Sequence, residues 1–279
     1  MRFVLATCRT RPALTPGDGR LAVALRNLGA AVVAAPWDTI EPAESEGAVC
    51  LRSTWDYHLR WEEFRDWVGR FEHSRRLWNP PSTVLWNADK LYLRDLASGG
   101  IALPRTHWFE PGERPDVMAL LEAWDADRVV LKPRVSATAY GTHLVSRDQG
   151  IGAAEWPALE RAGCLLQRFV PEIQSRGELS LVFLDGWYSH AVRKRPVTGE
   201  FRVQADFGGS LETATPADDT IGFGEAVLEA AARPWLYARV DLVETDAGPV
   251  LMELELIEPD LFLTPEGAAR LAEALMRQT

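Results

Sequence analysis

The chain has 279 residues, 47% of them hydrophobic and 25% charged, with a formal net charge of −10 at pH 7. This is the composition of a globular protein with room for two or three subdomains. The acidic balance and the lack of a long basic cluster exclude a general nucleic-acid surface, and no apolar run reaches membrane-spanning length. Three widely separated cysteines and an N-terminus unlike a signal peptide indicate a cytoplasmic protein.

The first third of the chain alternates between strand and helix patterns. Apolar runs predict three strands, and helical spacing predicts two helices, the first of them after a Pro/Gly/Asp loop at 12–19. The strands are 2–7, 31–36 and 48–52, and the helices are 21–28 and 61–71. This alternation predicts a small α/β unit with parallel strands, in which ligands bind beyond the carboxyl ends of the strands.

The segment Arg52-Ser-Thr-Trp-Asp-Tyr-His58 follows the third strand and therefore lies at the ligand-binding edge. We expect Arg52 to clamp a substrate carboxylate, and Trp55, Asp56 and Tyr57 to surround a substrate pocket. The alternative is a capped turn that begins the next helix. The position in the fold favours the substrate pocket.

Asn79-Pro-Pro81 interrupts the pattern and is the first predicted boundary. A helix, an extended segment, a second helix and a strand follow it, and then a polar loop, a short strand, a helix and a buried strand. In chain order they are the helix 90–96, the extended segment 104–109, the helix 117–124, the strand 128–134, the polar loop 135–142, a short strand ending at 146, the helix 156–162 and the buried strand 164–170. The last helix is expected to begin at Thr264 and Pro265 and to run through Met276.

Residues 178–183 and 187–193 flank Asp185-Gly186, which is a strong signal for a two-residue hairpin turn. A regular register sets Glu178 opposite Arg193. Such a pair suits simple sheet stabilisation and equally suits a ribose hydroxyl and a phosphate.

A second hairpin is predicted from the runs 238–245 and 249–257, which flank Asp246-Ala-Gly248. The loop has three residues in this prediction, so that Thr245 pairs with Pro249. The register matters because a slip of one residue moves every side chain to the other face.

This register places three acids on one face of the second hairpin. Asp241 falls opposite Glu253 and Arg239 opposite Glu255, and alternation along the strands brings the three carboxylates together. Three such acids repel one another unless a cation lies among them, and hard oxygen ligands suit Mg²⁺ shared with nucleotide phosphates. The alternative is a solvated strand face.

The order of these predicted elements and motifs along the chain resembles that of the ATP-grasp superfamily, in its glutathione-synthetase and RimK-like branch. The resemblance covers nearly the whole length. The resemblance implies an α/β (α+β) fold with an N-terminal parallel α/β domain, a small lid region and a C-terminal antiparallel-sheet domain with the metal site. The corresponding ranges are 1–82, 83–166 and 167–279.

The resemblance also implies roles for individual residues, with ATP and Mg²⁺ as cofactors. Lys90 and Lys132 match the lysines that reach the ATP phosphates. The other nucleotide contacts are a mobile loop with Ser136 and Thr138, an adenine segment of Gln167, Arg168, Phe169 and Val170, and a ribose-binding acid that is either Glu178 or Glu172. Around the transferred phosphate and acyl group lie Arg193, Arg202 and Gln204, and the metal ligands are Asp241, Glu253 and Glu255.

Three stretches are similar to a narrower group, the cycloserine-synthetase-like subgroup, which closes O-ureido-serine into a ring. They are Arg52-Ser-Thr-Trp-Asp-Tyr57, Trp78-Asn-Pro80 and Glu253-Leu-Glu-Leu-Ile-Glu-Pro-Asp260. The chain departs from the superfamily in two places: its loop has one glycine, Gly141, where relatives often have several, and Glu255 stands where the last metal ligand is often Asn.

The resemblance implies an ATP-dependent carboxylate–amine ligase that acts through an acylphosphate on a small amino-acid-like substrate, including ring closure of O-ureido-D-serine to D-cycloserine. The five scattered histidines form no metal or nucleophile–base spacing, which agrees with a reaction that needs positioning and charge neutralisation. The alternatives are a RimK-like ligase that modifies peptides or proteins, and a non-catalytic nucleotide-binding protein. A homodimer is the default assembly.

Overall fold

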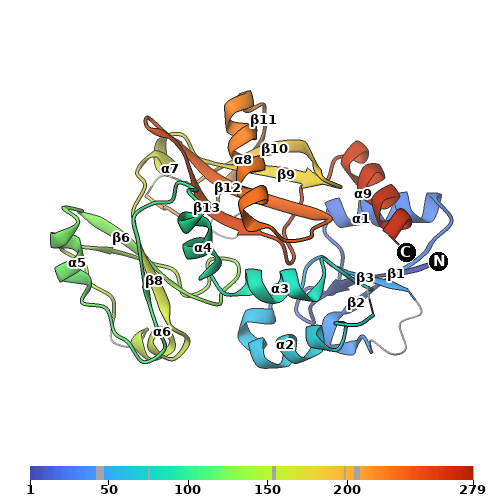
Figure 1. Ribbon diagram of the computed structural model, residues 1–279, viewed down its shortest axis with the longest axis horizontal. Coiled ribbons are helices and arrows are strands. Elements are labelled where there is room, and N and C mark those ends of the chain that lie inside the picture. The colour runs from blue at the N-terminus through green and yellow to red at the C-terminus, as the bar shows by residue number, and fades with distance from the viewer. Residues whose placement is uncertain (42–46, 75, 153–154, 198, 204–207, 279) are drawn as a thin grey trace.

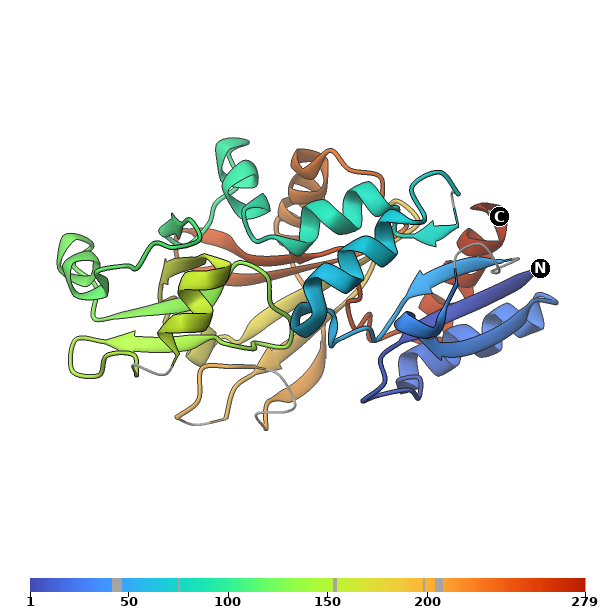
Figure 2. The ribbon, with the colours of Figure 1, turned by 90° about the horizontal axis from the view of Figure 1, so that it is seen from below.

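Three β-sheets follow one another along the molecule, with the first and the second at opposite ends and the third between them (Figures 1 and 2). The computed structural model describes residues 1–41, 47–74, 76–152, 155–197, 199–203 and 208–278. This arrangement confirms the expected α/β (α+β) fold, with a parallel N-terminal sheet and an antiparallel C-terminal sheet, and adds a second antiparallel sheet.

The first sheet has the order β2-β1-β3-β4 and is parallel. Its strands are β1 (Arg2–Thr7), β2 (Ala31–Pro36), β3 (Ala48–Leu51) and β4 (Leu77–Trp78). The helices around it are α1 (Pro16–Asn27), α2 (Trp61–Gly69), α3 (Pro81–Ala88) and the short η1 (Trp37–Thr39) and η2 (Tyr57–Arg60). The three predicted strands and the parallel unit are confirmed.

The predicted loop at 12–19 is wrong in its second half, because α1 begins at Pro16. The side chain of Thr15 accepts the backbone N–H of Asp18, and Pro16 occupies the first turn, where its missing N–H costs nothing. These cap signals were present in the sequence and outweigh the loop-like composition.

Both faces of the first sheet are covered, as its continuous apolar strands require. Phe3 and Leu5 pack against α1 and against the last helix, α9 (Pro265–Gln278). Val4 and Ala6, on the other face, pack against α2 and α3. The C-terminal helix therefore returns to the N-terminal sheet, where α9 lies beside α1 (Figure 1).

The second sheet is antiparallel, with the order β5-β8-β6-β7. Its strands are β5 (Thr106–Phe109), β6 (Arg128–Pro133), β7 (His143–Ser146) and β8 (Cys164–Arg168). Helices α5 (Val117–Ala123) and α6 (Trp156–Ala162) share its hydrophobic cluster. Because β8 crosses residue 166, the predicted boundary there falls inside a strand; the division into three ranges stays a prediction.

The third sheet has the order β11-β10-β9-β12-β13 and is antiparallel. Its strands are β9 (Glu178–Leu184), β10 (Trp187–Arg195), β11 (Ser210–Ala214), β12 (Tyr237–Thr245) and β13 (Gly248–Glu255). Helices α4 (Tyr92–Ser98) and α8 (Asp218–Ala231) pack on one face, and the short α7 (Glu172–Ser175) precedes β9.

β-Bulges correct the predicted register of both hairpins. The turn of β12 and β13 has two residues rather than three, since Thr245 pairs with Gly248. A bulge between Asp241 and Leu242 then restores the predicted pairs Asp241–Glu253 and Arg239–Glu255. The loop length was wrong, but the pairing of the acids is confirmed.

In the hairpin of β9 and β10, the bulge has the opposite effect. The register shifts between Tyr188 and His190, so that Glu178 pairs with Lys194, whereas Arg193 pairs with Leu179. The predicted Glu178–Arg193 pair is therefore wrong, because one extra residue in β10 exchanges the two faces.

An irregular segment after β13 has its backbone held by side chains. Six consecutive carbonyls, from Leu256 to Leu261, lie within hydrogen-bond distance of side-chain polar groups. In order, the partners are Asn79, Tyr237, Trp55, Arg52, Arg239 and His190, at 2.7, 3.0, 3.1, 2.7, 2.9 and 2.9 Å. We call residues 256–261 the pinned segment; its partners come from both the N-terminal and the C-terminal part of the chain.

Arg52 is the most deeply buried cation among these partners, at 1% exposure. Its Nε lies 2.7 Å from Asp18 Oδ1 and its Nη2 donates to Pro259 O at 2.7 Å, while the guanidinium stacks over Tyr237. All of these contacts hold the fold together.

Within the described residues, no helix combines the length and the apolar character that crossing a membrane requires.

Replacing Arg52 by Met is expected to lower the free energy of unfolding by about 3–5 kcal/mol, because Asp18 is left as an unpaired buried charge and Pro259 O loses its donor. Urea unfolding followed by tryptophan fluorescence measures the change. Arg65→Met is the matched control, since Arg65 is 47% exposed and its surface ion pair should contribute less than about 1 kcal/mol. Equal stability of the two variants would contradict the structural role of Arg52.

Candidate active site

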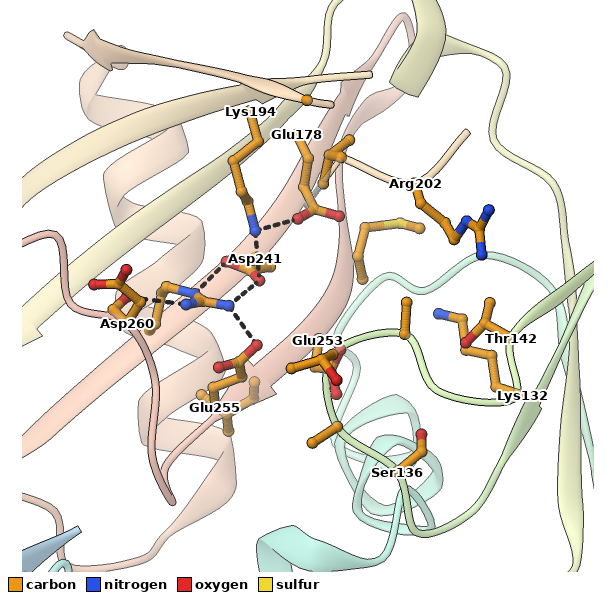
Figure 3. Close-up of a pocket in the computed structure, with 18 of the residues that line it drawn as sticks. Lys132, Ser136, Thr142, Glu178, Lys194, Arg202, Asp241, Glu253, Glu255 and Asp260 are labelled. Carbon is orange, nitrogen blue, oxygen red and sulfur yellow. Dashed lines mark hydrogen bonds and ion pairs between the residues drawn. The ribbon is translucent and has the colours of Figure 1, made fainter. Parts of the chain in front are cut away.

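A cavity of about 430 Å³ lies where the three parts of the chain meet. The N-terminal part contributes Trp55 and Tyr57 to its lining, the second sheet contributes Lys132 and Gln167, and the third sheet contributes the acids of β12 and β13. Figure 3 shows lysines, arginines and carboxylates converging on this space. The cavity therefore combines apolar walls with closely placed charges of both signs.

All three lysines of the chain line this cavity, although the chain has 30 lysine and arginine residues in total. Lys90 lies in the turn between α3 and α4, Lys132 on β6 and Lys194 on β10. The expectation that Lys90 belongs to a helix is wrong by two residues, because α4 begins at Tyr92. The amines are confined to one site, and the surface cations are arginines.

Lys90 links the loop of residues 135–142, which we call the lid loop, to the acids of β13. Its Nζ donates to Ser136 O at 2.9 Å and lies 3.1 Å from Glu253 Oε1. The neighbouring Asp89 accepts two hydrogen bonds from Arg134 Nε and Nη2, of which the Nη2 bond is 2.6 Å long. The beginning of the loop is thus fixed to the turn that carries Lys90.

The loop of residues 135–142 takes the backbone conformations that glycine usually supplies. Thr138, Ala139 and Gly141 have φ values of 52°, 57° and 65°. Ser136, Thr138 and Thr142 line the cavity. The loop thus reaches left-handed conformations at Thr138 and Ala139 as well as at its one glycine, and a loop of this kind can still place backbone N–H groups against a phosphate.

Lys132 lies in the cavity without an ion-pair partner among the described acids. Removal from water lowers the pKa of Lys132, and the positive charge of Lys90 lowers it further, although Glu253 opposes the shift. An unpaired ammonium in this position is suited to an anionic ligand.

The acids of the third sheet are neutralised by protein cations. Asp241 lies between Arg239, whose Nε is 3.0 Å from its Oδ1, and Lys194, whose Nζ is 3.0 Å from its Oδ2. Lys194 also lies 2.6 Å from Glu178, and Arg239 forms a further ion pair with Glu255. Figure 3 shows this network as a continuous chain of contacts.

These contacts shift the pKa values in opposite directions. Burial raises the pKa of Asp241, but Arg239 and Lys194 outweigh it, so that the net shift is downward. Burial raises the pKa of Glu255 to about 7 despite the opposing charge of Arg239. Burial also raises the pKa of Glu178, with Lys194 acting against it.

The predicted metal trio fits Mg²⁺ only in part. Both carboxylate oxygens of Asp241 are engaged by cations and by Ser180, whose Oγ lies 2.6 Å away. In the part of the chain that the structure describes, no group of three His, Cys, Asp or Glu side chains is placed to hold a metal. Glu253 and Glu255 keep one oxygen outside such contacts, and Mg²⁺ is commonly held by one or two carboxylates together with phosphates.

Most of the predicted nucleotide-binding residues line the cavity. The lining includes Lys90, Lys132, Ser136, Thr138, Gln167, Arg168, Phe169, Val170 and Glu178. Glu172, the rival of Glu178, is the first residue of α7 and is absent from the lining. Among the two acids, Glu178 is therefore the one that the structure brings to the cavity.

The three residues predicted around the transferred phosphate and acyl group have three different outcomes. Arg193 is absent from the lining, because the bulge in β10 turns it toward Glu244, whose Oε2 lies 2.9 Å away. Arg202 does line the cavity and forms an ion pair with Glu200 at 2.7 Å. Gln204 falls outside the described residues.

Of the predicted substrate residues, Trp55 and Tyr57 line the cavity, whereas Arg52 and Asp56 do not. Arg52 is occupied by Asp18 and by backbone carbonyls, and Asp56 accepts the indole N–H of Trp37 at 2.8 Å. The expected carboxylate clamp at Arg52 is therefore wrong, because burial has already assigned its donors.

Sequence reasoning missed Lys194, Arg239 and Glu258, all of which line the cavity. A usable signal existed for Lys194, since lysine is rare in this chain and the other two lysines were already assigned to the site. Arg239 and Glu258 carry no such signal, because arginine and glutamate are common in the sequence.

Comparison with known proteins supports the family resemblance expected from the sequence. Residues 3–79 match the family model described as "D-cycloserine synthetase DcsG, N-terminal domain". The chain is 31% identical to the cycloserine biosynthesis protein DcsG of Streptomyces lavendulae, with 90% of each protein covered. The crystal structure of D-cycloserine synthetase DcsG superposes with a TM-score of 0.83 at 29% identity, covering 100% of both chains.

More distant structures share the fold. The D-alanine–D-alanine ligase of Bacillus anthracis complexed with ATP has a TM-score of 0.69 at 16% identity, covering 100% of this chain and 97% of the ligase. The ATP-grasp ligase PsnB, complexed with a minimal precursor, Mg and ADP, has a TM-score of 0.64 at 16% identity, covering 99% and 97%.

The fold and the site define an ATP-grasp ligase, an ATP-dependent enzyme that forms C–N bonds and releases ADP. Within that class, the chain belongs to the family of the cycloserine biosynthesis protein DcsG.

The three lysines should differ in their reactivity toward an amine-acylating reagent at neutral pH. We expect Lys132 to react first, because its pKa is lowered and its side chain is partly exposed, whereas Lys90 and Lys194 are each 6% exposed and ion-paired. Peptide mass spectrometry after brief acetylation gives the order, with the α-amino group of Met1 as an internal reference. Faster acetylation of Lys194 than of Lys132 would contradict this electrostatic description.

Proposed function

We propose that this ATP-dependent ligase activates the carboxylate of a small amino-acid-like substrate as an acylphosphate, and that it closes the ring of O-ureido-D-serine to give D-cycloserine. The observation that carries the proposal is the convergence of all three lysines with the acids of β12 and β13 in one cavity. Similarity to DcsG over 90% of the chain supports the choice of substrate and a place in antibiotic biosynthesis.

In this proposal the nucleotide lies between the second and the third sheet. Residues 167–170, at the end of β8 and directly after it, present their backbone to the adenine. Lys90 and Lys132 bind the phosphates. Glu178 binds the ribose through the oxygen that Lys194 leaves open. One fold neighbour is a complex with ATP and another a complex with Mg and ADP, which supports both ligands here.

Glu253 and Glu255 are the residues that would hold Mg²⁺ together with phosphate oxygens. The ion, when bound, neutralises charge on those oxygens. The two side chains share one face of β13, and each has an oxygen outside its ion pair with a protein cation. Asp241 instead keeps Arg239 and Lys194 in position.

The chemistry assigned to the protein is positioning and charge neutralisation. The substrate carboxylate attacks the γ-phosphate and ADP leaves; the ureido nitrogen bonded to oxygen then attacks the acyl carbon and loses its proton, and inorganic phosphate leaves. Water cleaves the carbamoyl group from that nitrogen and releases it as carbon dioxide and ammonia, which leaves D-cycloserine. Lys132, Arg202 and Arg239 line the space in which these negative charges develop. Preorganised cations of this kind stabilise the transition state without any covalent step on the enzyme.

We also propose a cytoplasmic location, which is supported by three cysteines that are all free and buried. A homodimer remains the default proposal for the assembly.

Lys132→Ala and Glu253→Ala are each expected to reduce substrate-dependent ADP release by at least about 100-fold, since each removes a charge from the site of phosphoryl transfer. A coupled ADP assay with Mg²⁺ measures the loss. Glu62→Ala, on the exposed side of α2, is the control and should retain full activity. Undiminished activity in both site variants would exclude this cavity as the active site.

O-ureido-D-serine alone, with no added amine, is expected to support ADP release and to yield D-cycloserine, because both reacting groups belong to one molecule. Chromatography with mass detection identifies the product. ADP release only in the presence of a second amine would instead assign intermolecular ligation, and extension of a glutamate-rich peptide would assign the RimK-like alternative. ATP binding without turnover on any of these substrates would favour a non-catalytic nucleotide-binding protein.

A further inference from the structure

Glu258, in the pinned segment, is a buried carboxyl group that lines the cavity. It is 8% exposed, and no described side chain forms an ion pair or hydrogen bond with its carboxylate. Its electrostatic neighbours are Glu255 and Glu253 on β13, Arg239 on β12 and the hydroxyl of Tyr57 in η2. The side chain therefore faces the cavity at the end formed by the N-terminal part of the chain.

The other buried acids of the cavity differ from Glu258 in one respect. Glu253 is paired with Lys90, Glu178 with Lys194, and both Asp241 and Glu255 with Arg239. Within the described residues, Glu258 and Asp260 are the acids of the lining that form no ion pair with a protein cation. Asp260 is half-buried and its Oδ1 accepts the backbone N–H of Phe262 at 2.9 Å, so Glu258 is the buried one of the two. A buried carboxylate that lacks a cation is costly, so a positively charged ligand at this position gains more than it would at the paired acids.

The backbone around Glu258 is fixed, and its side chain is therefore preorganised. The carbonyl of Glu258 accepts the indole N–H of Trp55 at 3.1 Å, and the next carbonyl, Pro259 O, accepts Arg52 Nη2 at 2.7 Å. The carbonyls on either side are held by Tyr237 and Arg239. These contacts fix the position of the Glu258 backbone at the cavity wall, so that its side chain starts from a defined place.

The free protein is destabilised by this arrangement. Burial raises the pKa of Glu258 to about 8, and repulsion from Glu255 and Glu253 contributes to the shift. A carboxyl group whose pKa is raised on folding favours the folded state at low pH, and that contribution is lost as the pH rises from its ordinary value of 4.5 through 8. Such strain is typical of residues retained for binding.

We infer that Glu258 binds the ammonium group of the amino-acid substrate, with Trp55 and Tyr57 beside it. This inference rests on the proposed function and narrows its substrate class: the enzyme takes a substrate with a free α-amino group, and a carboxylic acid without that group binds poorly. Glu253 is an electrostatic neighbour of both Glu258 and Lys132, so the ammonium site and the lysine proposed to bind phosphate belong to the same cavity.

Glu258→Gln tests the inference, because the amide keeps the size of the side chain and leaves the backbone contacts in place. The KM for O-ureido-D-serine should rise by about 10- to 100-fold, as expected for loss of a charge-assisted hydrogen bond, while the KM for ATP stays unchanged. Glu266→Gln, at the exposed start of α9, is the matched control. An unchanged KM for the amino acid in Glu258→Gln would overturn the inference.

Binding measured without turnover separates this inference from the proposed function. In thermal shift experiments at pH 8.5, O-ureido-D-serine should stabilise the wild type but not Glu258→Gln. The N-acetylated form of the compound should not stabilise the wild type. Equal stabilisation of the wild type by the acetylated compound would exclude an ammonium site, even if ADP release occurred. Failure of ADP release with intact ammonium-dependent binding would instead reject only the proposed reaction.

The pH dependence of stability gives a third readout. Without ligand, Glu258→Gln should be more stable than the wild type at pH 9, because it lacks the buried charge, and the difference should shrink toward zero near pH 5. A variant less stable than the wild type at pH 9 would mean that the Glu258 carboxylate already has a stabilising partner in the protein, which the inference excludes.

Discussion

The pinned segment is the constraint on which the rest of the structure depends. Its carbonyls follow β13 without entering a sheet or a helix, and a buried carbonyl without a donor is costly. Side chains from distant parts of the chain supply those donors: Asn79, Trp55 and Arg52 from the N-terminal part, and Arg239 from the third sheet. The single hydroxyl hydrogen of Tyr237 is shared among the carbonyls of Leu51, Trp78 and Ile257. One strip of backbone thereby fixes the first sheet against the third, and the cavity forms between them.

The active site depends on which of its charged groups form ion pairs within the protein. Asp241, Glu253, Glu255 and Glu178 each form an ion pair with a protein cation, whereas Lys132 and the buried Glu258 form none among the described side chains. The ion pairs hold the paired groups in place, and a ligand of opposite charge gains more at the groups that have no ion pair. An unpaired cation beside the lid loop suits a phosphate, and an unpaired acid beside the tryptophan and tyrosine suits an ammonium group.

Much of this could be read from local patterns. The strands of the first sheet, the last helix and the lysine-bearing strand β6 were predicted because the apolar periodicity at those places has one interpretation. The pairs Asp241–Glu253 and Arg239–Glu255 were also predicted, although a shorter turn and a bulge compensate each other in the structure. The order of the motifs along the chain is enough to indicate the ATP-grasp class.

The sequence by itself therefore determined the class of fold, through the order of motifs along nearly the whole chain, and the pairing of the acids on β12 and β13, because that pairing depends on residues within one hairpin. It also indicated Lys90 and Lys132 through the family resemblance, and both line the cavity. Tertiary structure alone decided which neighbour faces the cavity. The bulge in β10 brings Lys194 rather than Arg193 to Glu178, and burial commits Arg52 to Asp18 and Pro259. Glu258 owes its position to donors from Trp55 and Arg52, about two hundred residues earlier. Periodicity carries no information about such contacts, since they are set by packing between parts of the chain that no local pattern connects.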